Sequence, residues 1–426
     1  MLPEGWRRST LGKIARITSG GTPDRSEPRY WGGSIPWVTT GEIQFNTITD
    51  TTEKISEAGL KNSSAKLFPP GTLLMAMYGQ GKTRGQMAKL GIEASTNQNS
   101  AAILLNEGHD PDFYFQFLSS KYDEIRDFGH SGGVSHLNAG LLVQIGVPVA
   151  PIDEQRRIAQ ILSAWDEMVV RTQSLLANRT VQWQALLAMT LHLPPANPSV
   201  NGDADNGGYP ASVQPGIPNL PPAPAGWHRT ALGQHLTEVR RHAALRADDE
   251  YRLVTVKRSR GGVELRETLT GREIKTPSQF YVRTGDFLIS KRQIVHGACG
   301  IVPAELDGAV VSNEYAVLNS DGQIDLRFLR YLSESRYFQQ TCFHSSIGVH
   351  VEKMIFKTER WLQWPFNIPP LPVQQRIVEV LDTARREVEL IAAQIERLKQ
   401  EKAALMADLL TGKRRVKLNA EAVSTP

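Results

Sequence analysis

Two long stretches of the chain carry apolar residues in alternating steps of three and four, the spacing that gathers side chains on one face of a helix. In the later stretch, over residues 377–409, nine of the ten positions with this spacing are apolar. The earlier stretch, over residues 158–190, has the same spacing but includes the polar residues Thr172, Arg179 and Thr190. Repeats sustained over this length predict two long helices that pair along these apolar seams as a coiled coil.

Short apolar runs separated by Gly, Pro, Asn and Asp precede each predicted helix. Examples are residues 72–77 in the first half of the chain and residues 287–290 and 309–318 in the second. Runs of this length between turn-forming residues are typical of β-strands. Each half also contains one aromatic-rich segment with helical character, at residues 113–118 in the first half. Each half therefore predicts a compact globule that mixes helices and strands, of the α+β class.

The two halves repeat one another with small insertions and deletions. Gly71 and Gly285 lie in matching strand-entry segments about 214 residues apart, and Pro151 and Pro370 begin matching helices about 219 residues apart. The intervening residues 193–225 are rich in Pro, Asn, Gly and Ala, which indicates a linker. We expect the two helices to pack antiparallel, so that a pseudo-twofold axis relates the globules.

The predicted organisation has six segments. They are a first globule (1–150), a first spacer helix (151–192), the linker (193–225), a second globule (226–369), a second spacer helix (370–415) and a tail (416–426).

Composition narrows the class of protein. Hydrophobic residues make up 40% of the chain and charged residues 22%, as in ordinary globular proteins. Two cysteines exclude a disulfide scaffold and fit a reducing compartment. No apolar run approaches the length of a membrane span, and the first residues lack a secretory signal, so we predict a soluble cytoplasmic protein without a membrane partner. The formal net charge of +4 permits a nucleic-acid partner without requiring one.

One family combines these features. The motif at the start of the first helix is made of Pro151, Glu154, Gln155, Ile158, Ile161 and Leu162. With residues 19–23, 35–38 and 399–416, it resembles the specificity subunit of type I restriction-modification systems. The second copy has Val373 before Gln374, where the family usually places glutamate.

The resemblance implies a DNA-reading scaffold with no catalytic residue and no cofactor of its own. Each globule would be a target-recognition domain for one half of a split sequence in double-stranded DNA. The helices would bind two modification subunits, which carry methylation that depends on S-adenosylmethionine. Separate restriction or motor subunits would use ATP and Mg²⁺.

Other chemistry leaves weaker traces in the sequence. No Asn/Asp-Pro-Pro-aromatic turn of an adenine methyltransferase is present. Gly81-Lys82-Thr83 resembles the end of a phosphate-binding loop, but Ala76 replaces the first glycine of that motif. A nucleotide-binding enzyme built on this loop is one alternative function, and a coiled-coil protein adaptor is another.

Histidines and cysteines in the second half of the chain could form a metal site. A zinc site would use four residues in two pairs, His296 with Cys299 and Cys342 with His344. We favour two half-buried reduced thiols instead, because the first copy has other residues at the matching positions. The histidines at 130, 136, 344 and 350 recur at matched positions without a nucleophile beside them, which argues against a catalytic triad.

Candidate DNA contacts lie where the two copies diverge. Arginine and lysine suit phosphates and guanine edges, and amides and hydroxyls suit other base edges. In the first globule the candidates are Thr22, Arg25, Arg29, Tyr30, Tyr78, Gln80, Lys82, Thr83 and Arg84. In the second globule they are Arg240, Arg241, Lys257, Arg258, Arg260, Lys291, Arg292 and Gln293. Arg258 and Arg292 are the strongest candidates for base contact, because the planar guanidinium matches the guanine edge.

Overall fold

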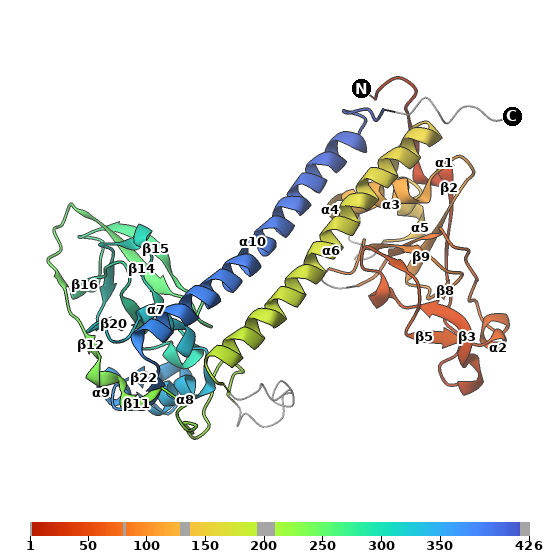
Figure 1. Cartoon of the computed structure of the whole chain (residues 1–426). Helices are drawn as coiled ribbons and strands as arrows, with labels where there is room; N and C mark the ends of the chain where they lie inside the picture. The colour runs from red at the N-terminus through yellow and green to blue at the C-terminus, as the bar shows by residue number, and fades with distance from the viewer. Residues whose placement is uncertain (1, 80–81, 128–136, 194–208, 418–426) are drawn as a thin grey trace. The chain divides into compact units, whose positions relative to one another are not determined.

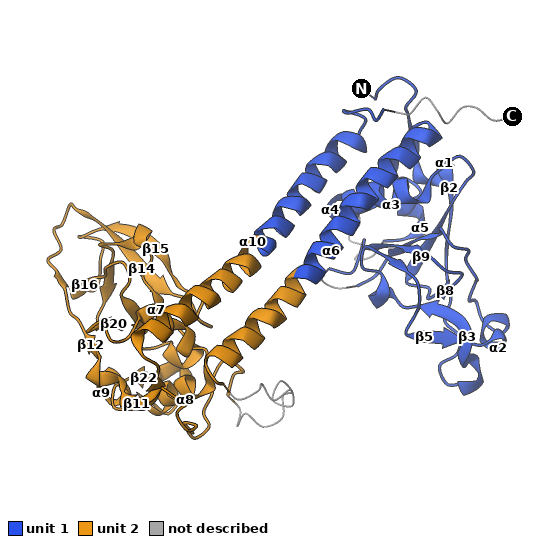
Figure 2. Ribbon diagram, in the orientation of Figure 1, with its two compact units in different colours: residues 1–175, 391–426 blue, residues 176–390 orange. Residues whose placement is uncertain are grey.

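The computed structural model describes residues 2–79, 82–127, 137–193 and 209–417 (Figure 1). The chain forms two compact units, Met1–Leu175 with Ile391–Pro426 and Leu176–Leu390 (Figure 2). Two helices of 39 residues, α6 (Ile152–Thr190) and α10 (Leu371–Leu409), are shared between the units. Each unit therefore contains one globule and a part of each long helix, and both globules mix helices and strands as predicted.

Unit 1 is built on an antiparallel sheet to which one parallel edge strand is added. Its strand order is β2 (Ala15–Ser19), β9 (Ser100–Leu105), β6 (Leu73–Ala76), β7 (Met87–Leu90) and β4 (Asn46–Ile48). A smaller sheet has the order β5 (Glu53–Ile55), β3 (Trp31–Val38) and β8 (Ser95–Thr96). The pair β1 (Arg7–Thr10) and β10 (Gly146–Val149) brings the two ends of the globule together.

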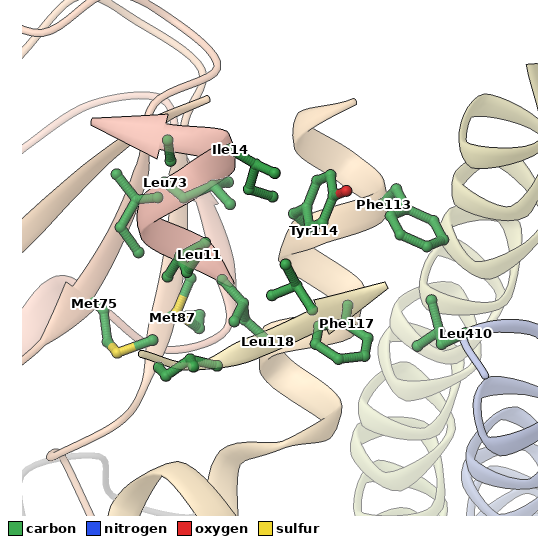
Figure 3. Close-up of a cluster of buried hydrophobic side chains, with 14 of the residues drawn as sticks. Leu11, Ile14, Leu73, Met75, Met87, Phe113, Tyr114, Phe117, Leu118 and Leu410 are labelled. Atoms are coloured by element: carbon green, nitrogen blue, oxygen red, sulfur yellow. The ribbon is translucent and has the colours of Figure 1, made fainter. Parts of the chain in front are cut away.

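A single core joins this sheet to the helices of unit 1. Helix α3 (Pro111–Ser120) begins at Asp110, whose side chain accepts the Phe113 amide, and it turns Phe113, Tyr114 and Leu118 inward. Figure 3 shows these side chains in one cluster with Leu11, Ile14 and Leu73, of which Leu73 comes from the fully buried strand β6; Phe113 lies at the opposite side of this cluster from Leu73. The core extends to Ile158 and Leu162 on α6 and to Leu409 and Leu410 at the end of α10. Burial of both helices in this core fixes the globule on their ends in unit 1.

Unit 2 repeats the principal sheet of unit 1. Its strands are β12 (Leu236–Glu238), β20 (Tyr315–Ser320), β17 (Phe287–Ser290) and β18 (Cys299–Ile301), in this order. They pair antiparallel in the same sequence as β2, β9, β6 and β7. The matched glycines Gly71 and Gly285 both have φ of +86°, a conformation that favours glycine, in the turn before β6 and β17. The duplication predicted from sequence is therefore present in the topology.

The units differ outside this common sheet. Unit 2 has a five-stranded sheet with the order β13 (His242–Ala243), β16 (Gln279–Tyr281), β19 (Val310–Ser312), β14 (Glu250–Val256) and β15 (Val263–Thr270). It also contains the pair β11 (His228–Ala231) and β23 (Pro365–Ile368), a short pair β21 (Ser346–Ile347) and β22 (Ile355–Phe356), and helices α7 (Leu326–Leu332) and α8 (Arg336–His344). A common frame thus carries a different second sheet in each unit.

The predicted seams are the less exposed faces of both long helices. On α10 the seam residues Ile391, Ile395 and Leu398 are buried within unit 1. Also within unit 1, Asp166 of α6 pairs with Lys402 of α10 at 2.5 Å, and Glu154 pairs with Arg415 just beyond α10. Residues near the start of α6 contact residues near the end of α10, so the two helices run in opposite directions within unit 1. Among the described residues, no helix is long and apolar enough to cross a membrane.

Candidate nucleic-acid interface

The segment from Ser19 to Pro23 passes close to its neighbours in unit 1. A Cβ on Gly20 would lie 1.8 Å from the Thr96 carbonyl oxygen, so only glycine fits there. The Gly21 amide donates to the same oxygen at 2.9 Å, and the Trp37 indole donates to the Gly21 carbonyl at 3.0 Å. These contacts hold Thr22 beside Gln98, with 2.5 Å between the Thr22 hydroxyl and the Gln98 amide oxygen.

A polar turn at residues 97–99 connects two groups of predicted DNA contacts. The buried Asn97 side chain binds the Thr40 hydroxyl at 3.0 Å and the Asn99 amide at 3.0 Å. The Asn99 carbonyl in turn accepts the amide of Met77, the residue before Tyr78. Thr22 and Tyr78 therefore lie at the two sides of one turn. Thr40, Gln98 and Asn99 belong to the same polar surface and were missed from sequence, because polar residues in a turn carry no distinguishing pattern.

The loop after β6 presents some of its predicted residues and buries another. Tyr78 is 40% exposed and Lys82 is exposed, whereas Arg84 is only 7% exposed. The half-buried Thr83 and the Lys82 carbonyl, which accepts the Tyr122 hydroxyl, belong to a turn that leads into strand β7. A phosphate-binding loop instead continues into a helix N-terminus. Gln80 and Gly81 lie outside the described residues.

Arg25 is held in a rigid aromatic and acidic setting. Its guanidinium lies 3.9 Å from the centre of the Trp31 ring and forms a two-pronged pair with Glu53. The Arg25 guanidinium lowers the pKa of the Glu53 carboxyl, and the carboxylate raises the pKa of Arg25. Arg29 extends into solvent beside Glu27, 3.3 Å away, and its guanidinium lies 5.5 Å from the half-buried Tyr30 ring. Arg29 is thus the more accessible of the two arginines.

In unit 2 the three basic runs, although far apart in sequence, meet in one region. Glu238 pairs with Lys291 at 3.0 Å and with Arg240 at 3.7 Å, which joins two of the runs. The turn after β14 joins the third, because the Arg260 amide donates to the Gly297 carbonyl at 2.8 Å, next to η5 (Ile294–His296). The fold thus assembles these runs into one basic surface, which we define by Arg240, Lys257, Arg258, Lys291 and Arg292.

Several predicted DNA contacts in unit 2 instead bind other residues of the protein and support the fold. Arg241 forms a two-pronged pair with Asp286, whose side chain is 2% exposed. The Arg260 side chain is 15% exposed and binds the Ser333 carbonyl at 3.1 Å, and the half-buried Gln293 opens η5. A buried charge with a buried partner is costly to redirect toward a ligand.

Four cations of the basic surface remain accessible. The side chains of Arg240, Lys257, Arg258 and Arg292 are 67%, 55%, 52% and 49% exposed. Their carboxylate partners are Glu238, Glu264, Glu352 and Glu314. The last three of these pairs are exposed on both sides, and such pairs contribute little to stability. A phosphate or a base can therefore replace these carboxylates at small cost.

The residues of the possible zinc site have other surroundings. Cys299 and Cys342 are buried, and burial raises the pKa of the Cys299 thiol to about 11. His296 is 1% exposed, lies 2.8 Å from the Ser212 hydroxyl and 3.2 Å from Glu352, and has a pKa lowered by burial. His344 contacts the Gly216 carbonyl. In the described parts of the chain, no three histidine, cysteine or acidic side chains form a group that could hold a metal.

The recurring histidines are only partly described. His350 is exposed at the start of a short 3-10 turn, η7 (Val351–Lys353). The predictions for His130 and His136 lie outside the described residues.

Both globules are fastened to the long helices by an equivalent buried glutamine. Gln155, at the start of α6, accepts the Asp110 amide at 2.9 Å and donates to the Ala150 carbonyl at 2.7 Å. Gln374, at the start of α10, accepts the Asp325 amide at 2.8 Å and donates to the Pro369 carbonyl at 2.9 Å. In each case the amide comes from the N-cap residue of a helix that lies earlier in the chain, Asp110 of α3 or Asp325 of α7. The glutamine of the motif is thus a junction residue.

The chain belongs to the family of type I restriction modification DNA specificity domains, whose model matches residues 3–176 and 240–400. The specificity subunit of the MjaIX type I restriction enzyme of Methanocaldococcus jannaschii is 26% identical over 173 residues, 39% of this chain and 39% of the relative. The EcoR124I/EcoR124II specificity subunit of Escherichia coli is 27% identical over 163 residues, 37% of this chain and 40% of the relative. Each alignment therefore spans about two fifths of the relative's length.

A solved structure shares the fold over nearly the whole chain. The S subunit of a type I restriction-modification system from M. genitalium superposes with a TM-score of 0.56 at 11% identity. The match covers 95% of this chain and 96% of that one. The family model thus confirms the assignment that the motifs suggested, and the fold has a known counterpart over 95% of this chain.

Proposed function

We propose that this chain is the sequence-reading subunit of a type I restriction-modification complex, with each globule binding one half of a bipartite site in double-stranded DNA. The observation that carries this proposal is the repeated sheet, β2-β9-β6-β7 in unit 1 and β12-β20-β17-β18 in unit 2, which supports a different second sheet in each unit. A shared frame with divergent polar surfaces suits two different half-sites.

We assign the DNA contacts to those predicted residues whose side chains are exposed to solvent. In unit 2, Arg240, Lys257, Arg258 and Arg292 contact DNA, whereas Arg241, Arg260 and Lys291 hold the surface in shape. Lys291 belongs to the second group because its side chain is only 17% exposed beside Glu238. In unit 1 the contacts are Thr22, Arg29, Tyr78 and Lys82 together with Gln98 and Asn99 of the polar turn. Arginine and amide side chains of this kind supply both phosphate and base-edge contacts.

The long helices serve as a spacer and as a docking surface. In this proposal α6 and α10 form an antiparallel coiled coil, a pseudo-twofold axis relates the globules, and two modification subunits bind the helices. Exposed apolar residues support the docking role, since Val181 and Met189 of α6 and Leu390 of α10 are 64%, 72% and 61% exposed. The chain itself catalyses nothing, and S-adenosylmethionine, ATP and Mg²⁺ act in the modification and restriction subunits.

A globule exchange tests this function. Residues 7–149, from β1 to β10, are replaced by the corresponding segment of another family member, which leaves Glu154 and Gln155 in place. The junction survives because Gln155 binds only backbone groups of the globule. Methylome sequencing of a host with the complete system should show one half of the methylated motif changed and the other half kept. A change in both halves, or in neither, contradicts the proposal.

A further inference from the structure

A small hairpin of unit 2 exposes an apolar tip. Strands β21 and β22 pair Ser346 with Phe356 and Ile347 with Ile355. Between them, Val349 is 95% exposed, the largest exposed fraction among the exposed large apolar residues of the described chain. Ile347 and Ile355 beside it are 46% and 40% exposed. We call these three exposed aliphatic side chains of one short hairpin the apolar tip.

The base of this hairpin is rigid. Phe356 is 1% exposed in the core, and its amide donates to the Lys291 carbonyl at 2.8 Å. Met354 is 7% exposed, and a Cβ on Gly348 would lie 2.8 Å from the Met354 Cα, so the tight approach requires glycine. The Ser346 hydroxyl donates to the Cys342 carbonyl at 2.8 Å. The apolar tip is therefore held in solvent by a fixed support.

Polar and charged groups lie beside the tip. His350 and Lys353 are exposed on the same turn. Glu352, between them, accepts Arg258 at 3.1 Å, which places the hairpin against the basic surface defined above. The backbone bond between Phe356 and Lys291 also joins the hairpin to this surface. Arg258 of the basic surface and Lys353 of the hairpin itself thus place positive charge near the aliphatic tip, a combination that complements a groove of duplex DNA, where phosphates border the base edges.

We propose that Val349 contacts a thymine methyl group in the major groove of the half-site bound by unit 2. The major groove admits a two-stranded ribbon, and the thymine methyl is its apolar base-edge group. Valine has no donor or acceptor with which to read any other edge. This assignment rests on the proposed function and deepens it, because it names a base type that the cations alone do not read.

The test uses the chain assembled with its modification subunits and a cognate duplex. Each thymine of the relevant half-site is replaced in turn by deoxyuridine, which removes only the methyl group. Wild-type protein should bind about fourfold more weakly at one such position, the effect of one buried methyl. Val349→Ala should bind the thymine duplex more weakly by a similar factor and should lose nothing further on deoxyuridine at that position.

A matched control is Ile217→Ala, because Ile217 is an aliphatic residue that is 86% exposed in the segment before β11. It should bind both duplexes like wild type. Val349→Ala with wild-type affinity, or with undiminished sensitivity to deoxyuridine, overturns the assignment. Unchanged DNA binding with weakened subunit assembly also overturns it and assigns the hairpin to a protein contact. In each of these outcomes wild-type protein still prefers its cognate duplex. A wild-type complex that does not distinguish cognate from scrambled DNA refutes the proposed function itself.

Discussion

The buried glutamines at the starts of α6 and α10 allow each junction between globule and helix to be broken separately. Gln155 and Gln374 are 0% and 1% exposed. Replacing either one by leucine keeps the approximate volume of the side chain and removes its amide. The change leaves one backbone amide and two carbonyl oxygens without their partner, at Asp110, Ala150 and Gly108 in the first case.

The expected cost follows from the number and quality of these bonds. In the first junction the bonds measure 2.9, 2.7 and 3.4 Å, so two of them are strong. In the second they measure 2.8, 2.9 and 2.9 Å. An unsatisfied buried polar group costs about 1–3 kcal/mol, and leucine recovers a part by apolar burial. We expect Gln155→Leu to lower the free energy of unfolding of its unit by about 2–3 kcal/mol, and Gln374→Leu by slightly more.

The measurement combines urea denaturation with amide hydrogen exchange. In the Gln155→Leu variant, amide exchange should accelerate in α3 and β10 but not in α7. In the Gln374→Leu variant it should accelerate in α7 but not in α3, because each glutamine accepts the amide of one N-cap residue in its own unit. Gln375→Leu is the matched control, since this neighbouring glutamine is exposed. The reasoning is refuted if Gln155→Leu and Gln374→Leu stay within about 0.5 kcal/mol of wild type, as expected for the control.

Three further predictions address the surface, the buried histidine and the helices. Arg258→Ala should weaken binding to DNA over a salt series, whereas Arg260→Ala should mainly lower stability; equal effects on both properties would contradict the division by exposure. Burial lowers the pKa of His296 from its ordinary value of 6.5, so the unfolded chain binds a proton at a pH where the folded chain does not. Unit 2 should therefore lose stability as the pH falls below about 6.5, and His296→Gln should flatten this dependence. Seven residues inserted after both Leu175 and Leu390, where the units divide, should lengthen the preferred gap between half-sites by about three base pairs, since one heptad adds about 10 Å and a base pair spans about 3.4 Å of the DNA axis. An unchanged gap with full methylation would exclude a spacer role.

The sequence predicted features that local rules determine. Continuous apolar runs bounded by glycine became the buried strands β6 and β17, and the glycines that aligned the repeat, Gly71 and Gly285, share one backbone conformation. A spacing of three and four residues identified both long helices because the less exposed face of each helix follows this spacing. These signals come from burial along a single element, so they remain readable without a partner.

Local sequence patterns could not distinguish the exposed basic residues from the buried ones. Arg258 and Arg260 are two positions apart, yet only Arg258 faces solvent. Arg260 has φ of +56° in the turn after β14, and this turn directs its side chain toward Glu334, far away in sequence. The placement depends on tertiary contacts to residues 296–297 and 333–334, which no local pattern encodes.

The departure of the second copy from the family motif has a physical cause in the two junctions. In unit 1, Glu154 is buried and binds the Trp6 indole at 3.2 Å and Arg415 at 2.9 Å, so it joins the first and last segments of the chain. These two segments lie so close together that a Cβ on Gly412 would be 2.6 Å from Pro3, a position that therefore favours glycine. The junction of unit 2 needs no such clamp, because the chain continues covalently from α6 through the linker into β11. Val373 occupies the equivalent position there and packs against the core. In unit 1 an ion pair thus joins segments that are far apart in sequence, whereas in unit 2 an aliphatic residue packs against the core at the equivalent position, where the backbone itself makes the connection.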